Sequence, residues 1–326
     1  MSNIGNNTKV KINKVIKTLP SFPSMVVASI TNKCSHACID CPYRKYSADK
    51  NYEEHHMAFR VFKKIVDEMT YYPESILRIC AWGEPCAHPD IINFVKYTNH
   101  RIGNTVLLTN GYYLGPTLDN ELMAAGLKLI EISIDAATIE TYRKIRYCRD
   151  KDAFHTVVNN ARNAIQKRNN NSRQFKTRIV VSYVTWPTVN SENEYLEFEK
   201  QWKGFADDVV KRRLTSFCGS VNPEQVEIPE NRLPCYGLWA RCNINPWGKI
   251  QICYNQWEKD KWVLGDLNES DVTIHQIWKS PEFDHLREEQ LNGKYLGPCV
   301  SCIDYNPYAW DHPFEEVYFR VVKKLW

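Results

Sequence analysis

Three cysteines lie close together near the N-terminus, directly after an apolar stretch that covers residues 24–30. They are Cys34, Cys38 and Cys41, which gives the spacing C-x3-C-x2-C. Three thiolates on one short loop can hold three irons of a cubane [4Fe-4S] cluster and leave the fourth iron open to a ligand from outside the protein. The alternative is a zinc site with three thiolates and a distant fourth ligand. The motif therefore predicts a metal centre.

Four further cysteines form a second group in the last third of the chain. They are Cys235, Cys253, Cys299 and Cys302, in the patterns C-x12-G-x4-C and C-x2-C. The stretch 242–253 is predicted to form a β-hairpin that turns at Pro246-Trp-Gly248. Four thiolates are a complete ligand set for zinc or for a [4Fe-4S] cluster, and the sequence alone does not distinguish the two.

The elements that must position these cysteines alternate between short β-branched runs and segments of helical periodicity, such as 57–69 and 154–166. This alternation favours a parallel sheet of right-handed βαβ units. Six strands are fewer than the eight of a full TIM barrel, so we predict an α/β fold with a partial, open (β/α)6 barrel. The expected strands cover residues 25–31, 76–81, 105–109, 129–134, 179–184 and 208–214.

Each of the first five expected strands ends in, or carries, a polar signature. After the cysteine loop come Ala81-Trp-Gly-Glu-Pro85, Thr109-Asn-Gly111, Ser133-Ile-Asp135 and, within the fifth strand, Ser182. In parallel barrels the chemistry gathers at the carboxyl ends of the strands. The order of these signatures therefore predicts one cavity that contains the first cysteine group.

The cysteine spacing and this ordered set resemble the radical S-adenosylmethionine (radical SAM) family. In that family the open iron is chelated by the amino and carboxylate groups of SAM. The resemblance implies that Ser133 and Asp135 contact the ribose, that Arg146, with Arg143 as competitor, pairs with the SAM carboxylate, and that Tyr43 backs the adenine. The implied cofactor-binding residues are Tyr43, Gly83, Glu84, Asn110, Ser133, Asp135, Arg146 and Ser182.

The second cysteine group is similar to the SPASM and twitch extensions of radical SAM enzymes, which carry auxiliary iron-sulfur clusters. Because no cysteine follows Cys302, the twitch type with one auxiliary [4Fe-4S] cluster is the better match, and a helix is expected over 273–287. The remaining cysteines are expected to be core thiols. Alternatively, Cys242, Cys218 or Cys148 could donate a hydrogen atom to a substrate radical, and of these three we predict Cys242 as the donor.

We accordingly divide the chain into four parts. They are an N-terminal arm (1–23), the barrel (24–215), a twitch or SPASM-like domain (216–310) and a C-terminal helix (311–326). The formal net charge of +4, from 42 basic and 38 acidic side chains, is too mild to indicate nucleic-acid binding. The sequence shows neither a membrane-spanning run nor a signal peptide, which predicts a cytoplasmic protein whose twelve cysteines serve metals rather than disulfides.

The resemblance implies an enzyme that receives an electron from flavodoxin or ferredoxin, cleaves SAM to a 5′-deoxyadenosyl radical and abstracts hydrogen from its substrate. We expect a small molecule of the sugar, cyclitol or nucleoside type, and dehydrogenation or epimerisation as the outcome, because no N-terminal winged helix for peptide recognition is evident. Epimerisation or crosslinking of a ribosomal peptide is the alternative. A structural zinc protein or an iron-sulfur electron-transfer protein is the alternative from another class. The sequence does not predict the oligomeric state.

Overall fold

The structure is a computed structural model, and it describes residues 19–39, 41–186, 189, 192–221, 232–302 and 304. The predicted C-terminal helix over 311–326 lies outside these residues, as do residues 1–18 of the predicted N-terminal arm. In the described segments, no helix has both the length and the apolar composition needed to cross a lipid bilayer.

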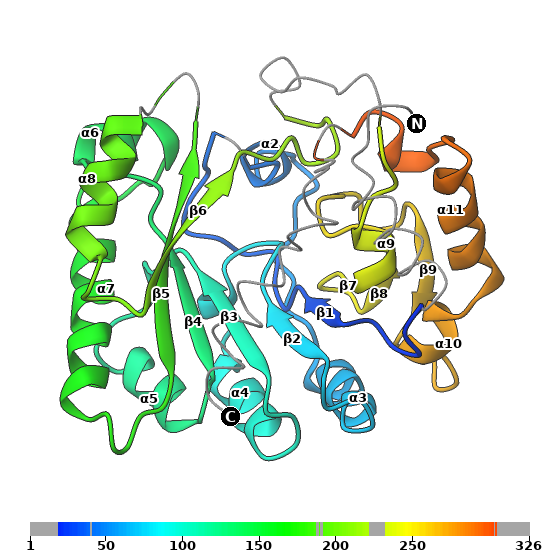
Figure 1. Cartoon of the computed structure of the whole chain (residues 1–326), viewed down its shortest axis with the longest axis horizontal. Helices are drawn as coiled ribbons and strands as arrows, with labels where there is room; N and C mark the ends of the chain where they lie inside the picture. Colours follow the sequence, from blue (N-terminus) through cyan, green and yellow to red (C-terminus); the bar gives the residue numbers. More distant parts are fainter. Residues whose placement is uncertain are drawn as a thin grey trace, which may run out of the picture.

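One sheet runs through the described part of the chain in the order β6-β5-β4-β3-β2-β1-β7-β8-β9 (Figure 1). The first six strands pair in parallel with their neighbours in sequence, as successive right-handed βαβ units require. The predicted partial (β/α)6 barrel is therefore confirmed. Its strands are β1 (Met25–Ala28), β2 (Ile76–Ile79), β3 (Thr105–Thr109), β4 (Leu129–Ser133), β5 (Arg178–Thr185) and β6 (Asp208–Arg213).

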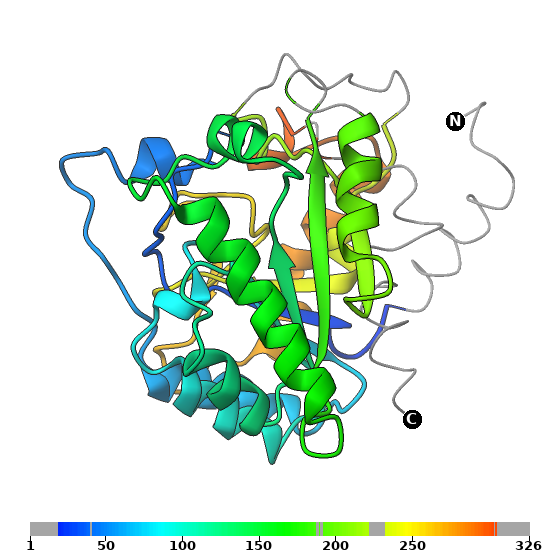
Figure 2. The same cartoon turned by 90° about the vertical axis from the view of Figure 1, so that its left-hand side faces the viewer.

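Helices cover the outer face of these strands, and Figure 2 shows α7 and α8 outside β5. Helix α3 illustrates the cause, because Phe62, Ile65 and Met69 form one apolar face that is fully buried against the sheet. The barrel helices are α2 (Tyr43–Tyr46), α3 (Phe59–Met69), η1 (Pro85–Ala87), α4 (Ile91–Asn99), α5 (Leu118–Ala124), α6 (Ile139–Ile145), α7 (Ala153–Asn170) and α8 (Glu192–Trp202).

The two faces of the sheet form separate cores. In β1, Val26 and Ala28 belong to the core under the helices, whereas Met25 and Val27 belong to a smaller cluster on the inner face. This is the period-two alternation of a strand. A side chain's position along a strand therefore decides whether it faces the helices or the inside of the barrel.

The predicted hairpin continues the barrel sheet. Strand β7 pairs in parallel with β1 and antiparallel with β8, and β8 pairs antiparallel with β9. The expected helix over 273–287 is two helices, because Ser280 caps a new helix that starts at Pro281. These elements are α9 (Gly237–Ala240), β7 (Arg241–Ile244), β8 (Lys249–Gln251), β9 (Val263–Asp266), α10 (Ile274–Trp278), α11 (Pro281–Leu291) and η3 (Gly297–Cys299).

Candidate functional site

The loop that carries Cys34, Cys38 and Cys41 follows β1 and is held by backbone contacts on both sides. The Ala37 N–H donates to the Tyr147 carbonyl at 2.7 Å, just beyond α6. Tyr43 lies at the start of α2, and its hydroxyl is 3.2 Å from both the N and the O of Cys34. Tyr43, for which we predicted an adenine contact, thus fixes the backbone of the first cysteine.

The turn after β2 packs directly against this loop at Gly83. Its φ is +60°, and a Cβ at this position would lie 2.5 Å from the Lys33 carbonyl oxygen. The next N–H, from Glu84, donates to the same oxygen at 2.6 Å. Only glycine allows this close approach without displacing the cysteine loop.

The Glu84 carboxylate is buried and connects the ends of β2 and β3. It accepts hydrogen bonds from the Thr109 hydroxyl at 2.6 Å and from the Asn110 N–H at 2.7 Å. Burial raises the pKa of Glu84, although these hydrogen bonds act in the opposite direction. Among the described residues, no lysine or arginine forms an ion pair with Glu84.

Asn110, at the end of β3, reaches the interior of the cysteine loop. Its side-chain nitrogen lies 3.2 Å from His36 Nδ1 and 3.7 Å from the Cys34 sulfur. The other ring nitrogen of His36 is 2.9 Å from the Tyr142 hydroxyl. Burial, assisted by Arg146, lowers the pKa of His36 to about 3, so the ring is neutral. This neutral histidine was not among the predicted site residues.

The signature after β4 forms a buried triad with α6. Arg146 donates to the Asp135 carboxylate through Nε at 3.0 Å and to the Ser133 hydroxyl through Nη2 at 2.6 Å. Asp135 also accepts from the Val184 N–H at 3.0 Å. Burial opposes the charge on Arg146, but Asp135 and Cys38 outweigh it and raise the guanidinium pKa well above its usual value. The three predicted residues therefore bind one another and face the cysteine loop.

Two further predictions concern Arg143 and Ser182. Arg143 donates to the Lys151 carbonyl at 3.1 Å on the surface, so Arg146 is the arginine that reaches the strand ends. The Ser182 hydroxyl is buried on β5 and has no hydrogen-bond partner within the described part of the chain. A buried hydroxyl without a partner fits a position that a bound ligand completes.

The second cysteine group also comes together in space. Cys235, Cys253, Cys299 and Cys302 interact electrostatically as one set, which we call the auxiliary site. Burial raises the pKa of Cys235 to about 12. The thiol of Cys218, which no spacing motif indicated, joins this set through Cys253 and Cys302. The sequence suggested Cys218 only as a possible hydrogen donor and not as a member of this set, because its position depends on the fold of the segment after β6.

An aromatic cluster lies between the first cysteine loop and the segment after β8. Trp82 and Trp257 stack with ring centroids 5.0 Å apart and an interplanar angle of 2°. Tyr43 packs edge-on against Trp257 at 6.3 Å, and Cys34 and Cys41 border the cluster. Trp82 also packs edge-on against Tyr46 of α2 at 5.8 Å, so both the barrel and the segment after β8 hold its ring.

The position of Cys242 argues against the predicted role as hydrogen donor. Cys242 lies on β7 and pairs with Val26 of β1, and both side chains belong to the core under the helices. Cys242 is therefore buried on the face of the sheet opposite to Met25 and Val27. A thiol in this position does not face the inside of the barrel.

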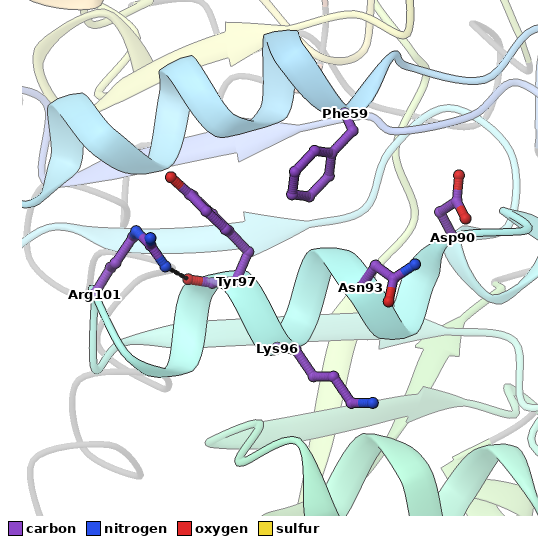
Figure 3. Close-up of a pocket in the computed structure, with 6 residues that line it drawn as sticks. All are labelled: Phe59, Asp90, Asn93, Lys96, Tyr97 and Arg101. Atoms are coloured by element: carbon purple, nitrogen blue, oxygen red, sulfur yellow. Dashed lines mark hydrogen bonds between the residues drawn. The ribbon is translucent and has the colours of Figure 1, made fainter.

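A surface pocket of about 450 Å³ lies on the helical layer, between the start of α3 and α4 (Figure 3). In it, Arg101 donates to the Tyr97 carbonyl at 3.3 Å. Its lining residues belong to neither cysteine site, so this pocket is separate from the predicted chemistry. They are Phe59, Asp90, Asn93, Lys96, Tyr97 and Arg101.

The donor groups at both cysteine sites fit iron-sulfur clusters. Burial raises the pKa of Cys34 to about 12, so the thiolate needs a nearby positive charge, which a bound metal provides. Three thiols on the first loop leave one iron of a cubane open, and Glu84 is a buried carboxylate to which a SAM ammonium could bind. The auxiliary site has enough thiols to ligate all four irons of a cluster.

Two family models match separate parts of the chain. Residues 28–198 match the model described as the radical SAM superfamily. Residues 235–303 match the SPASM model, described as an iron-sulfur cluster-binding domain. These models imply SAM with a [4Fe-4S] cluster in the first region and auxiliary iron-sulfur binding in the second, as predicted.

Individual relatives extend this similarity over most of the chain. The PqqA peptide cyclase of Bradyrhizobium diazoefficiens is 24% identical over 86% of this chain and 79% of its own length. Two other curated relatives are matched over only 36% and 62% of their length.

Solved structures show the same fold at low identity. Streptococcus suis SuiB bound to precursor peptide SuiA has a TM-score of 0.62 and 14% identity, covering 86% of this chain and 70% of SuiB. BtrN in complex with AdoMet and 2-DOIA has a TM-score of 0.52 and 17% identity, covering 83% of this chain and 87% of BtrN.

Proposed function

Because this chain belongs to the radical SAM superfamily and carries a SPASM domain, we propose that it cleaves SAM reductively and abstracts a hydrogen atom from an organic substrate. The observation that carries the proposal is the packing of the Cys34 loop against the backbone N–H of Glu84 and the side chain of Asn110, which come from two other strand ends. Flavodoxin or ferredoxin is the proposed electron donor.

Specific residues would hold the cofactors. Cys34, Cys38 and Cys41 would bind the cluster, and Glu84 would accept hydrogen bonds from the SAM ammonium. Arg146 uses Nε and Nη2 for its partners in the triad, and we propose that its other terminal nitrogen binds the SAM carboxylate. When bound, the [4Fe-4S] cluster and SAM supply a 5′-deoxyadenosyl radical that takes hydrogen from the substrate.

Dehydrogenation is the outcome that we favour. The auxiliary site contains four predicted thiol ligands, so a cluster there has no iron position open to substrate. This favours a role in electron transfer over direct binding of the substrate. Epimerisation requires a hydrogen donor on the inner side of the barrel, and the position of Cys242 under the helices does not support that role.

We propose a small-molecule substrate of the sugar, cyclitol or nucleoside type. The similarity to BtrN, which covers 87% of that protein, supports a barrel and auxiliary domain of comparable extent. A ribosomal peptide is the second candidate, because the PqqA peptide cyclase matches 86% of this chain and the SuiB structure contains a precursor peptide.

Anaerobic reconstitution tests this function. We expect about eight irons per chain, corresponding to two cubane clusters, and formation of 5′-deoxyadenosine from SAM after reduction. Incubation with deuterated candidate sugars, cyclitols, nucleosides and peptides, with mass spectrometry of the 5′-deoxyadenosine, then identifies the substrate class. A zinc-loaded protein that does not cleave SAM would contradict the proposal.

A further inference from the structure

The turn that follows β6 has an unusual backbone conformation. Phe217, Cys218 and Gly219 are consecutive residues with φ angles of +49°, +59° and +78°. For residues with a side chain, this left-handed conformation is sterically disfavoured. Such a turn persists only where the surrounding structure holds it.

The segment after η3 holds this turn. The Asp304 carboxylate accepts hydrogen bonds from the backbone N–H groups of Ser216 and Cys218, the latter at 2.9 Å. The Ser301 hydroxyl donates to the Cys218 carbonyl at 3.2 Å. A Cβ on Gly219 would lie 2.5 Å from the Ser301 carbonyl oxygen, so the two segments are in direct contact. These contacts flank Cys302 and present Cys218 to it.

The Cys218 thiol is directed at the auxiliary site. Its sulfur, the Cys302 sulfur and an Asp304 carboxylate oxygen all lie within 4.8 Å of one another. The thiol also hydrogen-bonds to Cys253. Five thiols therefore surround a site that needs four, and Cys218 is in direct contact with two of them.

We propose that Cys218 is a thiolate ligand of the auxiliary iron-sulfur cluster, beside Cys253 and Cys302. The fourth ligand then comes from Cys235 or Cys299, which the spacing motif also indicated. The strained turn and its Asp304 anchor have the function of presenting this thiol. The inference rests on the auxiliary cluster of the proposed function, but not on the substrate or the outcome of the reaction.

The test uses the full chain with Cys34, Cys38 and Cys41 replaced by alanine, so that all bound iron belongs to the auxiliary site. In this parent, Cys218→Ala should reduce the iron per chain to about half or less, because a missing ligand weakens metal binding strongly. If the fifth thiol takes the vacated position, the iron is retained but the electron paramagnetic resonance spectrum of the reduced cluster shifts. Cys242→Ala, which removes a buried thiol from the helix-facing core, is the matched control and should retain the iron of the parent.

The electron paramagnetic resonance spectrum of the reduced cluster separates ligation from folding. Cys218→Ser should retain more iron than Cys218→Ala but shift the spectrum, because a serine oxygen replaces sulfur at one iron. The proposal would be overturned if Cys218→Ala retained the full iron content and an unchanged spectrum. If the alanine variant does not fold, an unchanged spectrum in Cys218→Ser would overturn it instead. A parent without iron would instead overturn the auxiliary cluster itself, and the ligand role with it.

Discussion

The two cysteine sites of this chain are assembled in opposite ways. The first takes its thiols from one loop, residues 34–41, and the second takes them from segments near residues 218, 235, 253 and 299–302. Closing a loop costs entropy that rises only slowly with its length, but the second site must close several loops before its thiols meet. The first site is therefore a local motif, whereas the second is a product of the fold.

The two sites also differ in what surrounds the thiols. The first loop is bordered by a carboxylate, an amide and an arginine from other strand ends, namely Glu84, Asn110 and Arg146. The auxiliary thiols lie near Asp304 and also interact with Arg232 and Arg241, but there are enough of them to ligate every iron of a cubane, whereas the three thiols of the first loop leave one iron open. We infer that the first site is built to bind an external polar ligand and the second to enclose its metal.

The prediction with the largest expected effect concerns the first cysteine site. Cys34→Ala should abolish SAM cleavage, because two thiolates no longer hold the cluster in the required position. The measurement is 5′-deoxyadenosine formed per chain, by mass spectrometry. Cys242→Ala should cleave SAM as the wild type does, and equal cleavage by both variants would show that the first loop is not the cleavage site.

The second prediction distinguishes the two sites by the step that each serves, SAM cleavage at the first site and product formation at the auxiliary site. Cys302→Ala removes a thiol that both the motif set and the set with Cys218 contain. It should stop product formation but keep SAM cleavage within about tenfold of wild type, because sites without shared partners act nearly independently. The ratio of product to 5′-deoxyadenosine measures this uncoupling once the substrate is known. A variant that forms product at the wild-type ratio would remove the role of the auxiliary site.

The third prediction concerns the buried charges beside the first site. Arg146→Met leaves the Asp135 carboxylate buried without its cation and should lower the free energy of unfolding by about 3 kcal/mol or more, besides weakening SAM binding. Denaturant unfolding and calorimetric titration with SAM measure the two effects. Arg143→Met, at an exposed position of α6 just before Arg146, is the control and should change stability by about 0.5 kcal/mol or less.

The smallest expected effect tests the contact between the β2 turn and the cysteine loop. Gly83→Ala should destabilise the protein by about 1–3 kcal/mol, because φ is +60° and the new Cβ would clash with the Lys33 carbonyl. Thermal unfolding measures the loss. Gly103→Ala is the matched control, since its Cβ meets no atom within 4 Å and its φ is not in the left-handed region. Equal melting temperatures in the two variants would contradict the close packing.

Much of the fold could be predicted because strand and helix periods are local properties. The expected strand over 105–109 is β3 to the residue, and the expected helix over 57–69 is α3 from Phe59. The expected helix over 273–287 was wrong as one element, since apolar periodicity continues across Ser280 and Pro281 while the backbone restarts there. The side of the sheet on which Cys242 lies could not be predicted, because the face of a strand follows from its pairing register.

The sequence by itself determined the first cysteine motif, the order of polar signatures at the strand ends and the partial barrel, because each depends on short spacing or on a local period. Only the tertiary structure decided that Arg146 rather than Arg143 meets Asp135, that Trp82 stacks on Trp257, and that Cys218 joins the auxiliary site. These contacts link residues that are distant in the chain or on different faces of a helix. Which residues meet depends on how the helices and strands pack together, and the spacing of residues in the sequence does not determine that packing.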